Sequence, residues 1–306
     1  MILVVGVTSL LGSRVVQGLL EKGHKVRVLI SRQSSLESLA NLGLVTTIQS
    51  LIDAGAKPVW GDPKSEASLK AALSGVDTVI TTVSAAKHWG ADSIESVDWQ
   101  SVLNLIDSSR NAGVRRFLLA SISGLALDNP DHLSQIIGEY EQLLQSSGMT
   151  YTIIQPTVFM EYWIGMMVGI PLMTQQAVTL IGRGDHAHNF VSEQDVADYF
   201  VAMIDHPQAY NQTVMVGGPA SYTWTDVVVR IRNRMGAELP IQYAMMGTPI
   251  SYLPEKAYPF VTEFERFENH LDITEISKTF GVRPTTLDDY IDRAFGRQPA
   301  AIYSTF

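Results

Sequence analysis

The sequence predicts a doubly wound α/β protein, in which helices cover both faces of a parallel sheet. Short apolar runs alternate with amphipathic segments of helical length through the first half of the chain. The runs are apolar almost throughout, as in strands that are buried on both faces. Most helical segments end in glycine shortly before the next run, as in EKGHKV and NAGVRRF. Glycine there permits the left-handed backbone that ends a helix.

The expected elements of the first half follow directly from this alternation. The predicted strands are Ile2–Val5, Lys25–Ile30, Lys57–Trp60, Thr78–Thr82, Arg116–Ser121 and Tyr151–Gln155. The predicted helical patterns are Ser13–Lys22 (in a helix that begins near Leu10), Ser35–Ala54, Ser65–Leu73, Ile94–Ala112 and Ser134–Ser147.

The alternation weakens after Pro156. The block FVSEQDVADYFVAMIDHP predicts a strand end and then a helix capped at Ser192. The block NQTVMVGGPASYTWTDVVVRIRNRMG predicts a strand, a turn and a helix capped at Thr223 or Thr225. We expect residues 1–156 to form the first domain, and residues 157–306 to form a smaller α/β subdomain that is interleaved with it and shares its sheet.

Composition narrows the possible classes of protein. Of the 306 residues, 46% are hydrophobic and 17% charged, as in an ordinary globular protein with an ample core. The net charge of −9 argues against binding to a nucleic acid. There are no cysteines, which excludes disulfides and thiolate-bound metal. No signal peptide or membrane-spanning stretch is evident, so we expect a cytoplasmic protein without a membrane partner.

The opening stretch MILVVGVTSLLG has the features of a phosphate-binding turn. Gly6 follows the first strand and allows a tight turn, and Gly12 allows close packing of strand and helix. Ser9 stands where a third glycine would be usual, and its hydroxyl and that of Thr8 can donate to a phosphate oxygen. The first N–H groups of the helix would then face a diphosphate. A plain strand, turn and helix without a ligand is the alternative interpretation.

The end of the second strand indicates which dinucleotide would bind. The stretch VRVLISRQSS carries no carboxylate for the ribose hydroxyls that NAD presents, but it contains Ser31 and Arg32. Arginine can hold a 2′-phosphate through two hydrogen bonds. NADP(H) is therefore favoured over NAD(H), although a solvated loop arginine remains the alternative.

Five blocks of sequence, in order, resemble a known family. They are MILVVGVTSLLG, AKPVWGDPKSEASLKAALSGVDTVITTVSA, VDWQSVLNLIDSSRNAGVRRFLLASISG, SSGMTYTIIQPTVFME and NFVSEQDVADYFVAMIDHP. Together they resemble the NmrA-like atypical short-chain dehydrogenases/reductases. The resemblance implies a Rossmann-type sheet that binds NADP(H), with a small C-terminal substrate subdomain.

The resemblance also assigns individual positions to the cofactor. They divide into residues around the diphosphate, at the 2′-phosphate, on the adenosine side and beside the nicotinamide. In that order they are Gly6, Thr8, Ser9, Leu10, Leu11 and Gly12; Ser31 and Arg32; Asp62, Thr82, Val83 and Ser84; and Ser121, Ser123, Pro156, Thr157 and Phe159.

One departure from the typical short-chain dehydrogenases concerns catalysis. Their Tyr-x-x-x-Lys pair is missing, because Leu133 and Ile137 stand at the tyrosine and lysine positions. Carbonyl reduction by the ordinary mechanism is therefore not expected. Ser123 and His132 are the candidate catalytic residues. Ser123 could equally be a turn residue, and His132 a solvated or capping histidine.

Two further patterns have both a functional and a structural interpretation. His186 and His188, with Asp185 beside them, resemble part of a metal site, because alternating histidines on a strand point the same way. Two histidine ligands without a third ligand are weak evidence, and we assign no metal. The stretch MEYWIGMMVGIPLM could line an apolar substrate pocket with Tyr162, Trp163 and Met166, or could simply pack in a core.

Two functions from different classes follow. The first is an NADPH-dependent reductase of an apolar aromatic or conjugated small molecule, quinone-like or enone-like, whose product anion needs little help from a protein acid. The second is a non-catalytic NADP(H)-sensing regulator or partner-binding protein with the same fold. A monomer or a homodimer is compatible with either.

Overall fold

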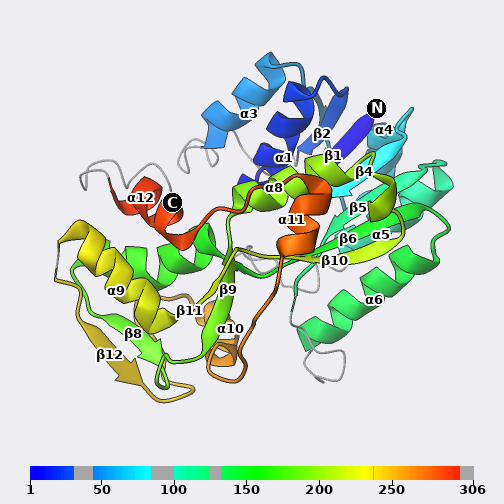
Figure 1. Ribbon diagram of the computed structural model, residues 1–306. Coiled ribbons are helices and arrows are strands. Elements are labelled where there is room, and N and C mark those ends of the chain that lie inside the picture. Colours follow the sequence, from blue (N-terminus) through cyan, green and yellow to red (C-terminus); the bar gives the residue numbers. More distant parts are fainter. Residues whose placement is uncertain (31–43, 84–99, 124–131, 237, 297–306) are drawn as a thin grey trace. The chain divides into compact units, whose positions relative to one another are not determined.

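The computed structural model describes residues 1–30, 44–83, 100–123, 132–236 and 238–296 (Figure 1). The chain divides into two units. Unit 1 is Met1–Pro156 with Val196–Met215, and unit 2 is Thr157–Asp195 with Val216–Phe306.

A seven-stranded sheet forms the centre of unit 1. Its strand order is β10-β6-β5-β4-β1-β2-β3, and β1 to β6 pair in parallel. Strands β2 and β3 lie on one side of β1, and strands β4, β5 and β6 lie on the other. The direction in which successive strands are added therefore reverses between β1 and β4, which is where doubly wound sheets bind their ligands. The predicted fold class is confirmed. The strands are β1 Ile2–Val5, β2 Val26–Ile30, β3 Lys57–Trp60, β4 Thr78–Thr81, β5 Arg116–Ala120, β6 Thr150–Pro156 and β10 Gln212–Val216.

Helices cover both faces of this sheet (Figure 1). Leu3 and Val5 of β1 belong to one apolar core with α4, α5 and α6, because alternate strand residues point to the same face. On the opposite face, α1 packs against α3 and against Val201 of α8. The helices are α1 Leu10–Glu21, α3 Leu44–Asp53, α4 Glu66–Leu73, α5 Gln100–Asn111, α6 His132–Ser146 and α8 Glu193–Met203.

A buried arginine contacts the second segment of unit 1, Val196–Met215. Arg116 is 7% exposed, and its Nε and Nη2 donate to the carbonyl oxygens of Ile204 and Met203, each at 3.2 Å. Its guanidinium also lies 4.7 Å from the ring centre of Tyr210. A buried cation is costly unless its donors are satisfied. These contacts therefore fix the chain between α8 and β10, which includes η4 (Pro207–Ala209).

Unit 2 contains two small sheets and several helices. The sheets have the orders β11-β9-β7 and β12-β8. Its strands are β7 Val158–Phe159, β8 Val178–Ile181, β9 Ala187–Val191, β11 Ser221–Thr223 and β12 Ile241–Ala244. Its helices are η3 Met160–Gly169, α7 Ile170–Thr174, α9 Trp224–Met235, η5 Glu255–Ala257, α10 Tyr258–Glu263, α11 Thr274–Phe280 and α12 Leu287–Phe295.

Aromatic rings dominate the core of unit 2. Trp163 and Phe264 meet edge to face at 5.0 Å, and Phe190 and Trp224 do so at 5.2 Å. Such pairs add to the stabilisation that burial provides. His188 lies against Phe264 with its ring fully buried, and this burial lowers its pKa to about 4. The imidazole is therefore neutral at physiological pH.

The long helices of unit 2 begin with capping boxes. Thr223 caps α9 and exchanges hydrogen bonds with Asp226, and Thr286 caps α12 and does so with Asp289. Of the two caps predicted for α9, Thr223 is therefore the one used. The hydroxyl of Thr225 instead donates to the carbonyl oxygen of Gly184 at 3.1 Å.

Candidate functional site

The turn between β1 and α1 presents the N-terminus of a helix at the end of a central strand. Gly6 has φ +99°, a conformation that side chains disfavour. Ser9 is the N-cap of α1, and the first turn of the helix contains no acidic residue. The first N–H groups of a helix have no partner within it. Together with the positive end of the helix dipole, they make this turn suited to an anion.

The two glycines are required by close backbone packing. A Cβ atom on Gly12 would lie 2.1 Å from the carbonyl oxygen of Gly6 and 2.7 Å from Oγ1 of Thr82. A Cβ atom on Gly6 would lie 2.6 Å from the same Thr82 atom. Strand, turn and helix therefore approach as closely as a dinucleotide-binding turn requires, and these residues fit the diphosphate of such a cofactor.

The hydroxyl of Ser9 has a structural role in the turn. It donates to the carbonyl oxygen of Gly6 at 2.9 Å and accepts a hydrogen bond from the N–H of Gly12 at 3.0 Å. That this hydroxyl donates to a phosphate stays a prediction. The N–H groups of Leu10 and Leu11, the first two helical residues, remain suited to that task.

The remaining predicted residues of unit 1 gather at one edge of the sheet. Because β1, β4, β5 and β6 are adjacent and parallel, the residues that follow them meet at the same edge. The register pairs Val5 with Thr81, and Ala120 with Ile154. Gly6, Thr82, Ser121 and Pro156 come directly after or at these strand ends.

Thr82 and Asp62 support neighbouring backbone. Thr82 is 4% exposed, and its Oγ1 donates to the carbonyl oxygen of Gly6 at 3.3 Å, so it fixes the glycine turn from behind. Asp62 is half-buried, and its Oδ1 accepts from the N–H of Lys64 at 2.8 Å in the turn before α4. The adjacent Val83 is half-buried, and its N–H donates to Oγ1 of Thr81 at 3.4 Å.

A polar cluster that the sequence did not reveal lies at the same edge. Glu141 of α6 accepts a hydrogen bond from the hydroxyl of Ser121. The side-chain amide of Gln155 donates to its Oε1 and Oε2, at 3.0 and 3.3 Å. The three residues come from α6, the end of β5 and the end of β6. A carboxylate thus fixes the direction of the Ser121 hydroxyl at the end of β5.

The helix position where lysine is usual is apolar. Ile137 is 5% exposed and packs in the core formed by α4, α5 and α6. No cation is held at this position of the helix. Ser123 is half-buried, and its N–H donates to the carbonyl oxygen of Pro156 at 3.1 Å, so the ends of β5 and β6 are joined there.

The predicted residues of unit 2 divide into buried and accessible ones. Thr157 is buried and donates to the side-chain oxygen of Asn189 at 3.1 Å, and Trp163 is only 9% exposed. Phe159, Tyr162 and Met166 are partly buried against the same core. Burial raises the pKa of Tyr162 well above its ordinary value. Core packing therefore accounts for Trp163, whereas the other three retain accessible surface.

Several predicted residues lie outside the described part of the structure. They are Ser31, Arg32 and Ser84. His132 is the first residue of α6, but only its backbone is described. The predictions made for these four residues stay predictions.

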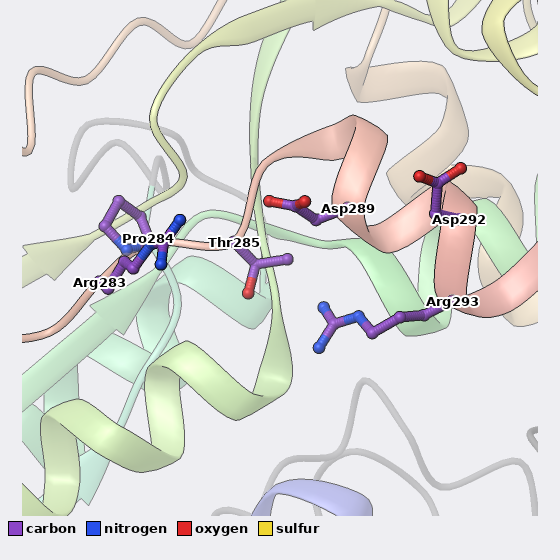
Figure 2. A pocket seen from close by; sticks show the side chains of 6 residues that line it. All are labelled: Arg283, Pro284, Thr285, Asp289, Asp292 and Arg293. Atoms are coloured by element: carbon purple, nitrogen blue, oxygen red, sulfur yellow. The ribbon is translucent and has the colours of Figure 1, made fainter.

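A charged hollow of about 420 Å³ lies in unit 2, near the start of α12 (Figure 2). Figure 2 shows Arg283, Asp289 and Arg293 around Thr285, whose hydroxyl donates to Asp195 at 2.7 Å. Hydrogen bonds from Thr286 are the main cause that lowers the pKa of the Asp289 carboxyl. The mixed charges suit a polar ligand better than an apolar one, and none of the predicted site residues lines this hollow.

In the described ranges, no helix combines the length and the apolar character that crossing a bilayer requires.

The sheet order, the glycine turn and the uncharged helix N-terminus together define a Rossmann-type dinucleotide-binding protein. The family model of the NmrA-like family matches residues 1–295. The chain belongs to this family, and the predicted resemblance is confirmed.

Three known proteins indicate the range of this family. A photosystem II assembly factor, Ycf39 of Synechocystis, is 28% identical over 97% of this chain and 91% of its own length. An NAD(P)H azoreductase of Xenophilus azovorans is 26% identical over 79% of this chain and 76% of its own. The NADPH complex of the Escherichia coli quinone oxidoreductase QOR2 superposes with a TM-score of 0.76 at 20% identity, covering 96% of this chain and 100% of that one. The predicted cofactor agrees with the cofactors that two of these names contain.

Proposed function

We propose that this chain is an NADPH-dependent reductase of an apolar aromatic or conjugated small molecule, such as a quinone or an enone. The observation that carries the proposal is the β1–α1 turn, where two glycines bring a helix N-terminus without acidic residues to the centre of the sheet. The azoreductase and quinone oxidoreductase relatives support the choice of acceptor class. When bound, NADPH supplies the hydride.

The residues of unit 1 would hold the cofactor and set the chemistry. The N–H groups of Leu10 and Leu11 bind the diphosphate, and Arg32 binds the 2′-phosphate. Glu141 fixes the hydroxyl of Ser121, whose oxygen then accepts a hydrogen bond from the nicotinamide half of the cofactor. The Ser121 oxygen, a hydrogen-bond acceptor, would thus orient the cofactor where the missing lysine usually does. Unlike that lysine, it would not lower the pKa of a tyrosine that donates a proton.

The acceptor would bind against the accessible aromatic and thioether groups of unit 2. Phe159, Tyr162 and Met166 present apolar surface, and a thioether adapts readily to flat aromatic ligands. Ser123 or His132 would assist protonation of the product. Acceptors whose reduced form is a stabilised anion need little such help, so they should react faster than simple aldehydes.

The experiment follows NADPH absorbance with a panel of quinones, azo dyes, enones and aldehydes. We expect consumption with conjugated acceptors, and little with aldehydes. Met166→Ala should raise KM for the acceptor while the Kd of NADPH stays constant. Equal activity toward aldehydes would contradict the proposed mechanism, because it would require a strong proton donor such as the tyrosine whose position Leu133 occupies.

A non-catalytic NADP(H) sensor or partner-binding protein is the second candidate. The buried Ile137 at the lysine position and the assembly-factor relative favour it. Tight NADPH binding without consumption by any acceptor of the panel would support this candidate and reject the reductase.

A further inference from the structure

A cluster of metal-ligating side chains surrounds the turn between β8 and β9 in unit 2. Asp185 and His186 end this turn, and Glu265 follows α10. One oxygen of each carboxylate and one ring nitrogen of His186 lie within 4.8 Å of one another. We propose that these three side chains bind a divalent transition-metal ion of the Zn²⁺ class. The sequence suggested Asp185, His186 and His188, whereas the cluster in the structure contains Glu265, 79 residues beyond His186, in place of His188.

The carboxylate of Glu265 is held rigidly in position. Its Oε2 accepts from the N–H of Arg183 at 3.1 Å, and its Oε1 accepts from the N–H of Gly184 at 2.9 Å. A Cβ atom on Gly182 would lie 2.2 Å from Oε2, so the turn leaves room for this carboxylate only because glycine stands there. Each oxygen keeps a further lone pair for an ion. The ligand is therefore positioned before any metal arrives.

His186 offers a nitrogen that has no other role among the described residues. Its Nδ1 is shielded from solvent and has no hydrogen-bond partner there. A metal ion bound at Nδ1 would give this buried atom a partner, and so remove the free-energy cost of leaving it unpaired. His188 lies outside the cluster, and its Nε2 contacts the carbonyl oxygen of Phe264 at 2.9 Å.

The contact of His188 with Phe264 also fixes the geometry of the cluster. It joins β9, which follows His186, to the residue immediately before Glu265. The N–H of Asn269 donates to the carbonyl oxygen of Ala187 at 2.9 Å and joins the same two segments again. The donors are therefore held on two segments that are tied together on both sides.

Asp185 is the adaptable member of the cluster. Its carboxylate now pairs with Nη2 of Arg183 at 2.9 Å, but the two side chains are 48% and 81% exposed. Exposed pairs of this kind contribute little to stability, so an ion can displace the arginine. In a tetrahedral site, bonds of about 2.1 Å place two ligand atoms about 3.4 Å apart, so the cluster has to contract, and the exposed Asp185 side chain can move to close it.

The donor set indicates the kind of ion. Imidazole suits Zn²⁺, Ni²⁺ and Cu²⁺ and is a poor ligand for Mg²⁺, whereas two carboxylates neutralise a double positive charge. Three protein ligands leave at least one position for water. An ion here would bridge the β8–β9 turn to the chain after α10 and stabilise unit 2 by mass action.

The test uses the full chain without an affinity tag and titrates it with Zn²⁺ in a calorimeter. We expect one saturable site and a higher melting temperature with Zn²⁺. His186→Gln and Asp185→Asn should each weaken binding at least about tenfold, since even indirect partners of ligands are worth that much. His270→Gln, a neighbouring histidine outside the donor set, is the matched control and should bind Zn²⁺ as the unaltered chain does.

Three outcomes would overturn the proposal. They are the absence of saturable binding, equal affinity in His186→Gln, and Mg²⁺ binding as tight as that of Zn²⁺, which would show that the imidazole does not participate. Glu265→Gln loses turn contacts as well, so its melting temperature without metal is compared first. Substitution by Co²⁺ adds a direct readout, because its visible spectrum reports nitrogen and oxygen ligands and should change in His186→Gln.

Discussion

Helices α9 and α12 of unit 2 begin differently from helix α1 of unit 1. In unit 2, the N-termini of α9 and α12 are closed by capping boxes that place the carboxylates of Asp226 and Asp289 on the first N–H groups. In unit 1, α1 is capped by the neutral hydroxyl of Ser9 and has no carboxylate in its first turn. The first arrangement neutralises the helix dipole within the chain, and the second leaves it for an anion.

This difference distinguishes α9 and α12, whose N-termini are stabilised within the chain, from α1, whose N-terminus can bind a ligand. A capping box satisfies two donors and contributes to folding whether or not a ligand is present. The cap of α1 satisfies one donor, and the close contact between Gly12 and Gly6 leaves no room for a side chain at position 12. Four sets of variants test this separation, in order of decreasing expected effect.

Gly12→Ala should have the largest effect. Its Cβ atom would meet the carbonyl oxygen of Gly6 at 2.1 Å, and backbone cannot move aside as a side chain can. We expect the free energy of unfolding to fall by about 3 kcal/mol or more, with loss of NADPH binding. Urea unfolding and NADPH fluorescence measure both.

Gly18→Ala is the matched control for that substitution. It lies in the same helix, and its Cβ atom would meet Cγ2 of Val201 at 3.0 Å, which a side chain can accommodate. NADPH affinity should be retained. A similar loss in both variants would mean that general disruption of α1, and not the glycine turn, explains the result.

Ser9→Asp should separate capping from ligand binding. Aspartate still caps the helix, so the melting temperature should be maintained. Like charges about 4 Å apart repel by roughly 4 kcal/mol near a protein surface before screening by salt. We therefore expect NADPH affinity to fall about tenfold to a hundredfold. Ser9→Asn, the neutral cap, should bind NADPH normally, and a loss of affinity in that variant would contradict the electrostatic explanation.

Glu141→Gln should affect turnover more than binding. Hydrogen bonds to charged groups contribute about 1.5–3 kcal/mol, so we expect kcat to fall about tenfold or more because Ser121 is less firmly oriented. The Kd of NADPH should change less than about threefold, since the diphosphate contacts remain. Glu139→Gln, an exposed residue of the same helix, is the control and should leave kcat unchanged.

Thr286→Ala and Thr223→Ala should have the smallest effects, confined to unit 2. Each removes an N-cap hydroxyl and should lower the free energy of unfolding by about 1 kcal/mol. NADPH affinity should stay constant in both variants. A clear loss of affinity in either would show that the caps of unit 2 also serve the cofactor.

The capping box of α12 also predicts a dependence on pH. Hydrogen bonds from Thr286 lower the pKa of Asp289 below its ordinary value of 3.8. Its contribution is therefore complete above pH 3.8 and is lost as the pH falls through the lower pKa of the folded state. Asp289→Asn should be less stable than the unaltered chain at neutral pH, and this difference should shrink as the pH falls below 3.8.

Sequence reasoning was effective where one physical preference dominates. An apolar run of this length, bounded by a glycine turn, favours a strand of a covered sheet, and Ile2–Val5 matches the structure at both ends and is buried throughout. Lys57–Trp60 also matches at both ends, although this strand lies at the edge of the sheet and is largely exposed. Few residues can replace glycine in a tight turn, so the sequence alone predicted the turn that Gly6 and Gly12 form. The hydrogen bond from their neighbour Ser9 to the carbonyl oxygen of Gly6 was not predicted, because the direction of a hydroxyl depends on three-dimensional detail.

The rest depends on contacts between distant segments. Glu141 contacts Ser121 because α6 packs on the sheet with this side of the helix toward the end of β5. The apolar face of the helix indicates which side is buried, but not which polar residue lies beside the strand end. Apart from Glu161, the stretch Met160–Gly169 is apolar on nearly all sides, so its periodicity carried little information about its π-helical form. Glu265 reaches the β8–β9 turn across a separation that no local pattern encodes.

The path of the chain has a consequence for how this protein could be rearranged by recombination. The backbone passes between the units three times, after Pro156, Asp195 and Met215. A gene fragment that ends at Pro156 would lack the carbonyl groups of Met203 and Ile204, and Arg116 would be left as a buried cation without these acceptors. Exchange of unit 2 for a foreign counterpart therefore requires three simultaneous joints. Such a chain diversifies by substitution within its units more readily than by shuffling of modules.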